Sequence, residues 1–83
     1  MMVTVKYFAS IREDIGAASE VLDTKADNLA ELRDELLSRS AAHAQSLARG
    51  KAVRMALNQV MCEESAALFD GCEVAFFPPV TGG

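Results

Sequence analysis

Hydrophobic and polar residues alternate along the start of the chain, from residue 2 to residue 9. A period of two is typical of a β-strand with one buried face, and the side chains expected to be buried are Val3, Val5, Tyr7 and Ala9. Phe8 then falls on the side of Thr4 and Lys6, where a large aromatic ring has no core to join. Phe8 is therefore a first indication of a surface that another protein covers.

Helical spacing follows in the next part of the chain. Residues 10–16 end at a glycine and predict a turn or a short helical connection, and residues 19–23 predict a strand that pairs back on the first. Asn28 is placed to cap a helix whose leucines recur at helical spacing. Residues 41–49 predict a second helix that ends at a left-handed Gly50, although the two helical segments could also be one broken helix.

Alternation returns in the last third of the chain. Residues 52–58 predict a third strand, residues 60–62 a short edge strand, and residues 73–77 a last strand after a turn marked by an Asp-Gly pair. The side chains expected to face the core are Val53, Met55, Leu57, Val74 and Phe76. Phe77 falls on the opposite, polar face of its strand, as Phe8 does on the first strand.

The order of these elements is strand, strand, helix, strand, strand. It predicts an α+β fold in which a mixed sheet of four to five strands carries one or two helices on one face. With 83 residues and no internal repeat, low-complexity segment or linker, we expect a single domain over residues 1–83. Pro78 and Pro79 end the last strand, so residues 78–83 are expected to form a flexible C-terminal tail.

The net charge of the chain limits the classes of partner that we expect it to bind. The chain carries 12 acidic and 8 basic residues, for a formal net charge of -4. A nucleic acid is therefore not expected as a partner, and an acidic domain is steered towards a basic docking face. The first residues lack the apolar stretch of a signal peptide, and no apolar run approaches the ~20 residues of a membrane span. We expect a cytoplasmic protein that does not associate with membranes.

The side chains offer little chemistry of their own. Cys62 and Cys72 are too few and too far apart for a zinc site, a redox pair or an iron–sulfur cluster. His43 has no ligand or catalytic partner at a suitable spacing, so a solvent-facing or structural histidine is expected. We expect no bound metal or cofactor, and without a glycine-rich phosphate loop any activation has to come from other proteins.

The end of the chain is its most informative feature, because two glycines, Gly82 and Gly83, follow shortly after the two prolines. Residues without a Cβ can enter a tunnel too narrow for side chains, and the prolines would hold the tail away from the body. A carboxylate becomes an acyl donor once attack on the α-phosphate of ATP gives an acyl-adenylate, which a sulfur donor can convert to a thiocarboxylate. We therefore expect a carrier whose working group is the carboxylate of Gly83.

The run EVAFFPPVTGG at residues 73–83 resembles the ending of the small subunits of molybdopterin synthase, a family of ubiquitin-related sulfur carriers. The run ALNQ at residues 56–59 and the opening strand through Arg12 and Glu13 are also similar to that family. The resemblance implies a β-grasp fold with the first and last strands side by side at the centre of the sheet. It also implies that ATP is used by an activating enzyme and is not bound by the carrier.

The same resemblance implies a set of partners. An E1-like adenylyltransferase activates Gly83, a sulfur donor forms the thiocarboxylate, and a catalytic large subunit passes the sulfur to cyclic pyranopterin monophosphate within a heterotetramer. The chain is then a non-catalytic subunit of a sulfurtransferase. The residues expected to contact these partners are Phe8, Arg12, Met61, Phe77, Pro78, Pro79, Val80 and Thr81.

Several alternatives stay open at this point. Met61 fits core packing as well as partner binding, and Cys72 stands where the family's turn more often carries an acid, although we expect an inert thiol and no internal sulfur relay. The tail chemistry also fits a thiamine-pathway sulfur carrier or a ubiquitin-related modifier that is joined to lysines. A further alternative is an interaction module whose diglycine is incidental.

Overall fold

The computed structural model describes residues 1–48 and 50–79, and the expected tail at residues 80–83 lies outside the described residues. In chain order the described elements are β1 (Met2–Tyr7), α1 (Ala9–Ile15), β2 (Ser19–Asp23), α2 (Leu29–Leu37), α3 (Ala41–Ser46), β3 (Arg54–Leu57), β4 (Val60–Cys62) and β5 (Glu73–Phe77).

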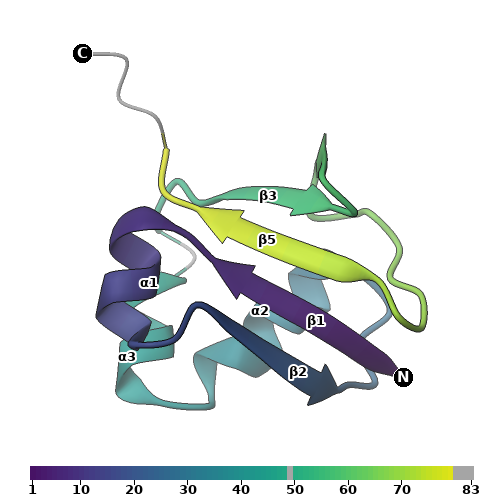
Figure 1. Ribbon diagram of the computed structural model, residues 1–83, viewed down its shortest axis with the longest axis horizontal. Coiled ribbons are helices and arrows are strands. Elements are labelled where there is room, and N and C mark those ends of the chain that lie inside the picture. The colour runs from purple at the N-terminus through teal and green to yellow at the C-terminus, as the bar shows by residue number, and fades with distance from the viewer. Residues whose placement is uncertain (49, 80–83) are drawn as a thin grey trace.

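The five described strands form one mixed sheet in the order β2-β1-β5-β3-β4 (Figure 1). β1 and β5 pair in parallel, and the other neighbouring pairs are antiparallel. The first and last strands therefore lie side by side, as expected for a β-grasp fold. The described residues form three helices where one or two were expected, because residues 9–15 form a helix and the two later helical segments are separate.

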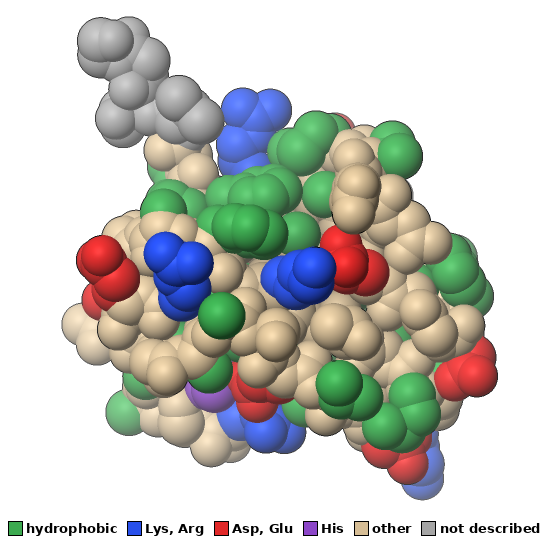
Figure 2. All heavy atoms as spheres, viewed as in Figure 1, with side chains coloured by type: hydrophobic (Ala, Val, Ile, Leu, Met, Phe, Trp, Pro, Cys, Tyr) green, Lys and Arg blue, Asp and Glu red, His purple; other side chains and the backbone are tan. Residues whose placement is uncertain are grey.

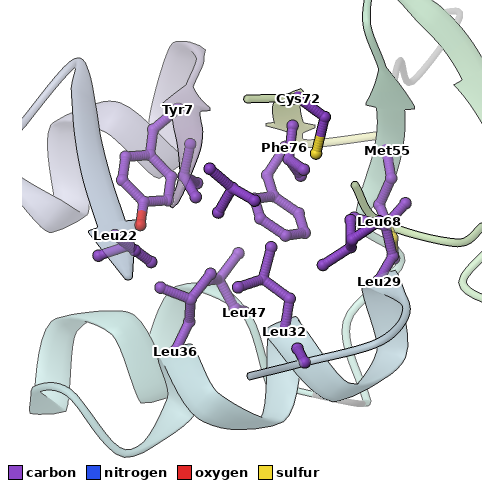
Figure 3. Packing of buried hydrophobic residues seen from close by; sticks show 14 of the residues in the cluster. Tyr7, Leu22, Leu29, Leu32, Leu36, Leu47, Met55, Leu68, Cys72 and Phe76 are labelled. Atoms are coloured by element: carbon purple, nitrogen blue, oxygen red, sulfur yellow. The ribbon is translucent and has the colours of Figure 1, made fainter. Parts of the chain in front are cut away.

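The core lies between the sheet and the helices (Figure 3). The inward faces expected for the first and last strands are confirmed, since Val5 and Phe76 are fully buried and Tyr7 is 1% exposed. The rings of Tyr7 and Phe76 stack with their centroids 6.4 Å apart. Leucines from α2 pack against these rings, and each fully buried leucine or phenylalanine contributes about 1.5–3 kcal/mol to folding. This packing fixes the position of β1 and β5.

The chain leaves β1 earlier than the alternation indicates. Ala9 was expected in the buried face of the strand, but it is exposed, has a φ of 51° and begins α1. Its positive φ turns the chain out of the sheet. Phe8 still has an extended backbone, with φ -125° and ψ 154°, so it is the last residue that keeps the strand geometry.

The expected helix over residues 41–49 was too long. α3 ends at Ser46 with Leu47 as its C-cap, and Gly50 does not adopt the left-handed conformation expected of a cap. The physical reason is Arg33, a buried side chain of α2. Its guanidinium donates hydrogen bonds to the carbonyl oxygens of Leu47 and Ala48, both at 2.7 Å, and so draws these groups out of a helical arrangement.

The hairpin of β3 and β4 has a turn that the sequence reasoning did not specify. Asn58 and Gln59 both have positive φ values, 48° and 69°, which is the conformation of a type I′ turn. The Asn58 side-chain oxygen accepts a hydrogen bond from the Glu73 backbone N–H at 2.8 Å, so the turn is tied to β5. The strand also begins later than expected, at Arg54, and Val53 and Leu57 are only half-buried.

A polar network lies at the edge of the core between β2 and α3. One oxygen of the Glu20 carboxylate lies 2.7 Å from His43 Nε2 and accepts the Tyr7 hydroxyl at 2.7 Å, and the other lies 2.9 Å from Arg39. His43 is buried and therefore structural, not solvent-facing. Burial alone would raise the pKa of Glu20, but the hydrogen bonds from His43 and Tyr7, with the charge of Arg39, hold the pKa below the usual glutamate value of 4.5.

Because the pKa of Glu20 is lowered in the folded protein, the free energy of unfolding depends on pH in the acidic range. The stabilisation from ionised Glu20 is complete above the usual value of 4.5 and is lost as the pH falls through the lower native value. We expect Glu20→Gln to reduce the free energy of unfolding at neutral pH by about 1–3 kcal/mol, since it disrupts a half-buried acceptor of three hydrogen bonds. The variant should also lose less stability than the parent between about pH 5 and pH 3.

Urea unfolding at a series of pH values measures both effects. Glu13→Gln is the matched control, because Glu13 is exposed on α1. An equal pH dependence of the parent and Glu20→Gln over this range would contradict the role given to the network.

Candidate functional site

The sheet face opposite the core carries the candidate site, and Phe8 shows how the sequence builds it. The extended backbone of Phe8 continues the alternation of β1, so its side chain lies on the face of Lys6. Its N–H donates to the Phe76 carbonyl oxygen at 3.2 Å, which holds it beside β5. The ring remains 39% exposed. The structure therefore confirms the prediction that Phe8 lies on the face of the sheet away from the core.

Phe77 occupies the corresponding position on β5. The ring centroids of Phe8 and Phe77 are 5.3 Å apart with their planes tilted by 38°, so the two aromatics form one contact pair. Phe77 ends β5, and the half-buried Pro78 and exposed Pro79 follow it directly. The departure point of the C-terminal segment is therefore fixed beside the aromatic pair.

Small residues hollow the sheet next to this pair. Ala56 and Ala75 lie opposite each other on β3 and β5, and Met61 lies opposite Ala56 on β4. A methyl group leaves space that the larger neighbours do not fill, and the result is a groove of about 280 Å³. The groove is lined by Lys6, Phe8, Ala56, Gln59, Met61, Glu73, Ala75 and Phe77, and we call it the docking groove. Figure 2 shows hydrophobic side chains gathered on this face of the sheet.

The position of Met61 decides whether its side chain packs in the core. Its side chain is 51% exposed and lines the docking groove, so it is not part of the core. Ordinary core packing, the other interpretation of the sequence, is therefore wrong for Met61. An exposed methionine adapts its shape easily to a partner surface.

Charged side chains border the groove. Lys6 Nζ forms an ion pair with Glu73 Oε1 at 3.1 Å. Arg12 is exposed on α1, one turn after Phe8. Arg54 is exposed on β3, directly opposite Phe77, and sequence reasoning missed it. The signal that could have found Arg54 is its place on the polar side of the third strand, but that position gains meaning only when β3 pairs with β5.

The structure thus brings together part of the expected contact set. Phe8, Met61 and Phe77 meet at the docking groove. Arg12 is not one of its lining residues and lies on α1, one turn after Phe8. Pro78 and Pro79 come directly after Phe77 in the sequence. The other expected site residues, Val80, Thr81, Gly82 and Gly83, lie outside the described residues. An exposed apolar hollow with an aromatic pair is a surface suited to binding another protein.

The surroundings of the two cysteines do not favour a reactive thiol. Cys72 is fully buried in the core, which leaves its thiol no access to a sulfur donor. Burial, with the nearby charge of Glu63, raises the pKa of Cys62, so its thiol stays protonated at neutral pH.

Within residues 1–48 and 50–79, no group of three His, Cys, Asp or Glu side chains is placed to hold a metal ion. None of the described helices is both long and apolar enough to cross a bilayer.

Comparisons with known proteins extend over nearly the whole chain. A family model described as the ThiS family matches residues 5–83. The molybdopterin synthase sulfur carrier subunit of Escherichia coli K12 is 38% identical over 82 residues, which covers 99% of this chain and 100% of that protein.

Two solved structures have the same fold, and each match covers 100% of this chain and 100% of the other. One is a chain from a protein–protein complex of subunits 1 and 2 of the molybdopterin-converting factor of Helicobacter pylori, with 30% identity and a TM-score of 0.70. The other is small archaeal modifier protein 1 from Haloferax volcanii, with 25% identity and a TM-score of 0.79.

Proposed function

Since the chain belongs to the ThiS family, we propose that it is the sulfur carrier subunit of a molybdopterin synthase. The observation that carries the proposal is the family match through Gly83, joined to a strand that ends at an exposed apolar groove. The groove binds the partner and the terminal glycines deliver the reacting group. The 38% identity to the Escherichia coli carrier over its full length supports this choice among the diglycine carriers.

The proposed chemistry takes place at the carboxylate of Gly83. One carboxylate oxygen attacks the α-phosphate of ATP, which releases pyrophosphate and leaves an acyl-adenylate. Sulfide from the sulfur donor then attacks the acyl carbon and displaces AMP, so the chain ends in a thiocarboxylate. Glycine at the last two positions leaves the backbone narrow enough to enter a partner's active site.

The proposal assigns each remaining step to a partner. An E1-like adenylyltransferase binds ATP, a separate sulfur donor supplies sulfur, and the catalytic large subunit transfers it to cyclic pyranopterin monophosphate. Two sulfur atoms per dithiolene require two charged carriers, which fits a heterotetramer with two carriers and two large subunits. The carrier needs no cofactor of its own in this cycle, and the demand for ATP fits a cytoplasmic location.

The docking groove is the proposed contact for these partners. Phe8, Met61 and Phe77 provide the apolar centre, and Arg12 a polar contact at the rim. Pro78 and Pro79 would set the direction in which Val80 and Thr81 lead the two glycines into the partner. Because a single groove would serve the activating enzyme and the large subunit, the two should bind one at a time.

The other candidate roles differ in the partner that binds. The likeness to small archaeal modifier protein 1 keeps a protein modifier as the second candidate. We expect the purified chain to form a stable complex with a molybdopterin synthase large subunit in size-exclusion chromatography, and not with a thiazole synthase. Covalent adducts on many cellular proteins, without a complex with the large subunit, would favour the modifier and contradict the proposal.

A further inference from the structure

The docking groove is bordered by positive charge, although the whole chain has a net charge of -4. Arg12 follows Phe8 by one helical turn, and its N–H donates to the Phe8 carbonyl oxygen at 3.3 Å. This backbone hydrogen bond places Arg12 one turn beyond Phe8, on α1. On the other side, Arg54 is the direct cross-strand neighbour of Phe77. Arg12 thus follows Phe8 along the chain, and Arg54 stands next to Phe77 across the sheet.

These two charges are not neutralised within the described part of the chain. Neither Arg12 nor Arg54 forms an ion pair with a residue of 1–48 or 50–79, whereas the third cation, Lys6, is paired with Glu73. Figure 2 shows Lys and Arg side chains around the apolar cluster on this face. The two arginines are therefore cationic groups near the groove of a protein that is acidic as a whole.

We propose that Arg12 and Arg54 recognise carboxylate side chains that border the docking site of the catalytic large subunit. This inference rests on the proposed function, because it describes the chemistry of that partner's surface. A guanidinium forms strong bidentate hydrogen bonds with a carboxylate. An apolar centre with charged groups at its rim is the usual anatomy of a protein interface. This proposal differs from the sequence expectation that an acidic domain meets a basic docking face.

Arg54 has a specific part in this recognition. It stands beside the last residue of β5, just before the segment that leads to the reacting carboxylate. A carboxylate of the partner placed opposite Arg54 would orient the carrier so that this segment faces the partner's active site. Rim charges of this kind act mainly on the association rate and on the choice of partner.

The test measures binding of charge-reversed carriers to the large subunit of the same organism. Arg54→Glu and Arg12→Glu are compared with Lys25→Glu, which makes the same change of charge. Lys25 is exposed and follows β2, whose last residue pairs with Met2 at the end of β1 far from Phe8. Association and dissociation rates are recorded by surface plasmon resonance at about 0.05 M and about 0.3 M salt, a range over which screening of exposed charges changes markedly.

We expect Arg54→Glu and Arg12→Glu each to weaken binding by roughly tenfold at the lower salt concentration, mainly through slower association. The salt dependence of the association rate should flatten or reverse in both variants, and Lys25→Glu should differ from the parent by less than about twofold. Equal rates and salt dependence for Arg54→Glu and Lys25→Glu would overturn the inference and leave the proposed function standing. A parent chain that fails to bind the large subunit at any salt concentration would overturn both.

Discussion

A chain that lacks Gly83 is expected to transfer no sulfur, while its fold and its affinity for the large subunit stay unchanged. The reason is that the carboxylate of Gly83 is the proposed reacting group, and removal of one residue withdraws it by about 3.5 Å from the attacking atoms. A misplacement of 1 Å already costs about a hundredfold in rate at many active sites. No other change of one residue in this chain should have so large an effect on activity with so small an effect on stability.

The measurement is formation of molybdopterin in a reconstituted reaction with the activating enzyme, ATP, a sulfide source, the large subunit and cyclic pyranopterin monophosphate. A chain with one alanine added after Gly83 keeps both glycines but moves the carboxylate outward, and it should be equally inactive. Thermal unfolding and large-subunit affinity provide the control for each variant. Sulfur transfer at the parent rate by the truncated chain would favour the interaction module, in which the diglycine is incidental.

Truncation of either aromatic in the docking groove is expected to weaken binding to the large subunit by roughly 30-fold or more. Aromatic anchors at the centre of an interface typically account for about 2 kcal/mol or more of binding free energy. Phe8 and Phe77 contact each other beside the hollow formed by two alanines, so each alanine variant also removes support for the other ring. Calorimetric titration of Phe8→Ala and Phe77→Ala with the large subunit measures the effect.

Phe69→Ala is the matched control for the aromatic variants. Phe69 is 49% exposed, which is comparable to Phe8, but it lies in the loop before β5. This loop is tied to the opposite end of β1, because the next residue, Asp70, accepts a hydrogen bond from the Met2 N–H at 2.7 Å. If Phe69→Ala weakened binding as strongly as Phe77→Ala, the interface would not be the docking groove.

The fold followed from the sequence where local pattern and tertiary structure agree. The alternation of the first and last strands placed Val5 and Phe76 in the core and left Phe8 and Phe77 outside it, and the structure confirms both faces. An apolar side chain on a polar face is a strong signal, because a solvated strand has no packing reason to carry it. The aromatic part of the candidate site could therefore be found without coordinates.

Features that depend on contacts distant in the sequence could not be predicted. Gly50 was assigned as a helix cap because glycine often ends a helix, but Arg33 from the preceding helix binds the carbonyl groups that would have continued α3. The network of Glu20 and His43 likewise joins residues 23 positions apart. Arg54 looks like an ordinary exposed arginine until the sheet order places it opposite Phe77.

The central claim is that Gly83 carries sulfur as a thiocarboxylate, and the mass of the intact chain tests it most directly. The chain is incubated with an E1-like activating enzyme, ATP and a sulfide source, beside a control carrier and a chain without Gly83. The account predicts a mass gain that matches the replacement of one oxygen by one sulfur, in the full chain and not in the truncated chain. An unmodified full chain, under conditions that charge the control carrier, would contradict the account.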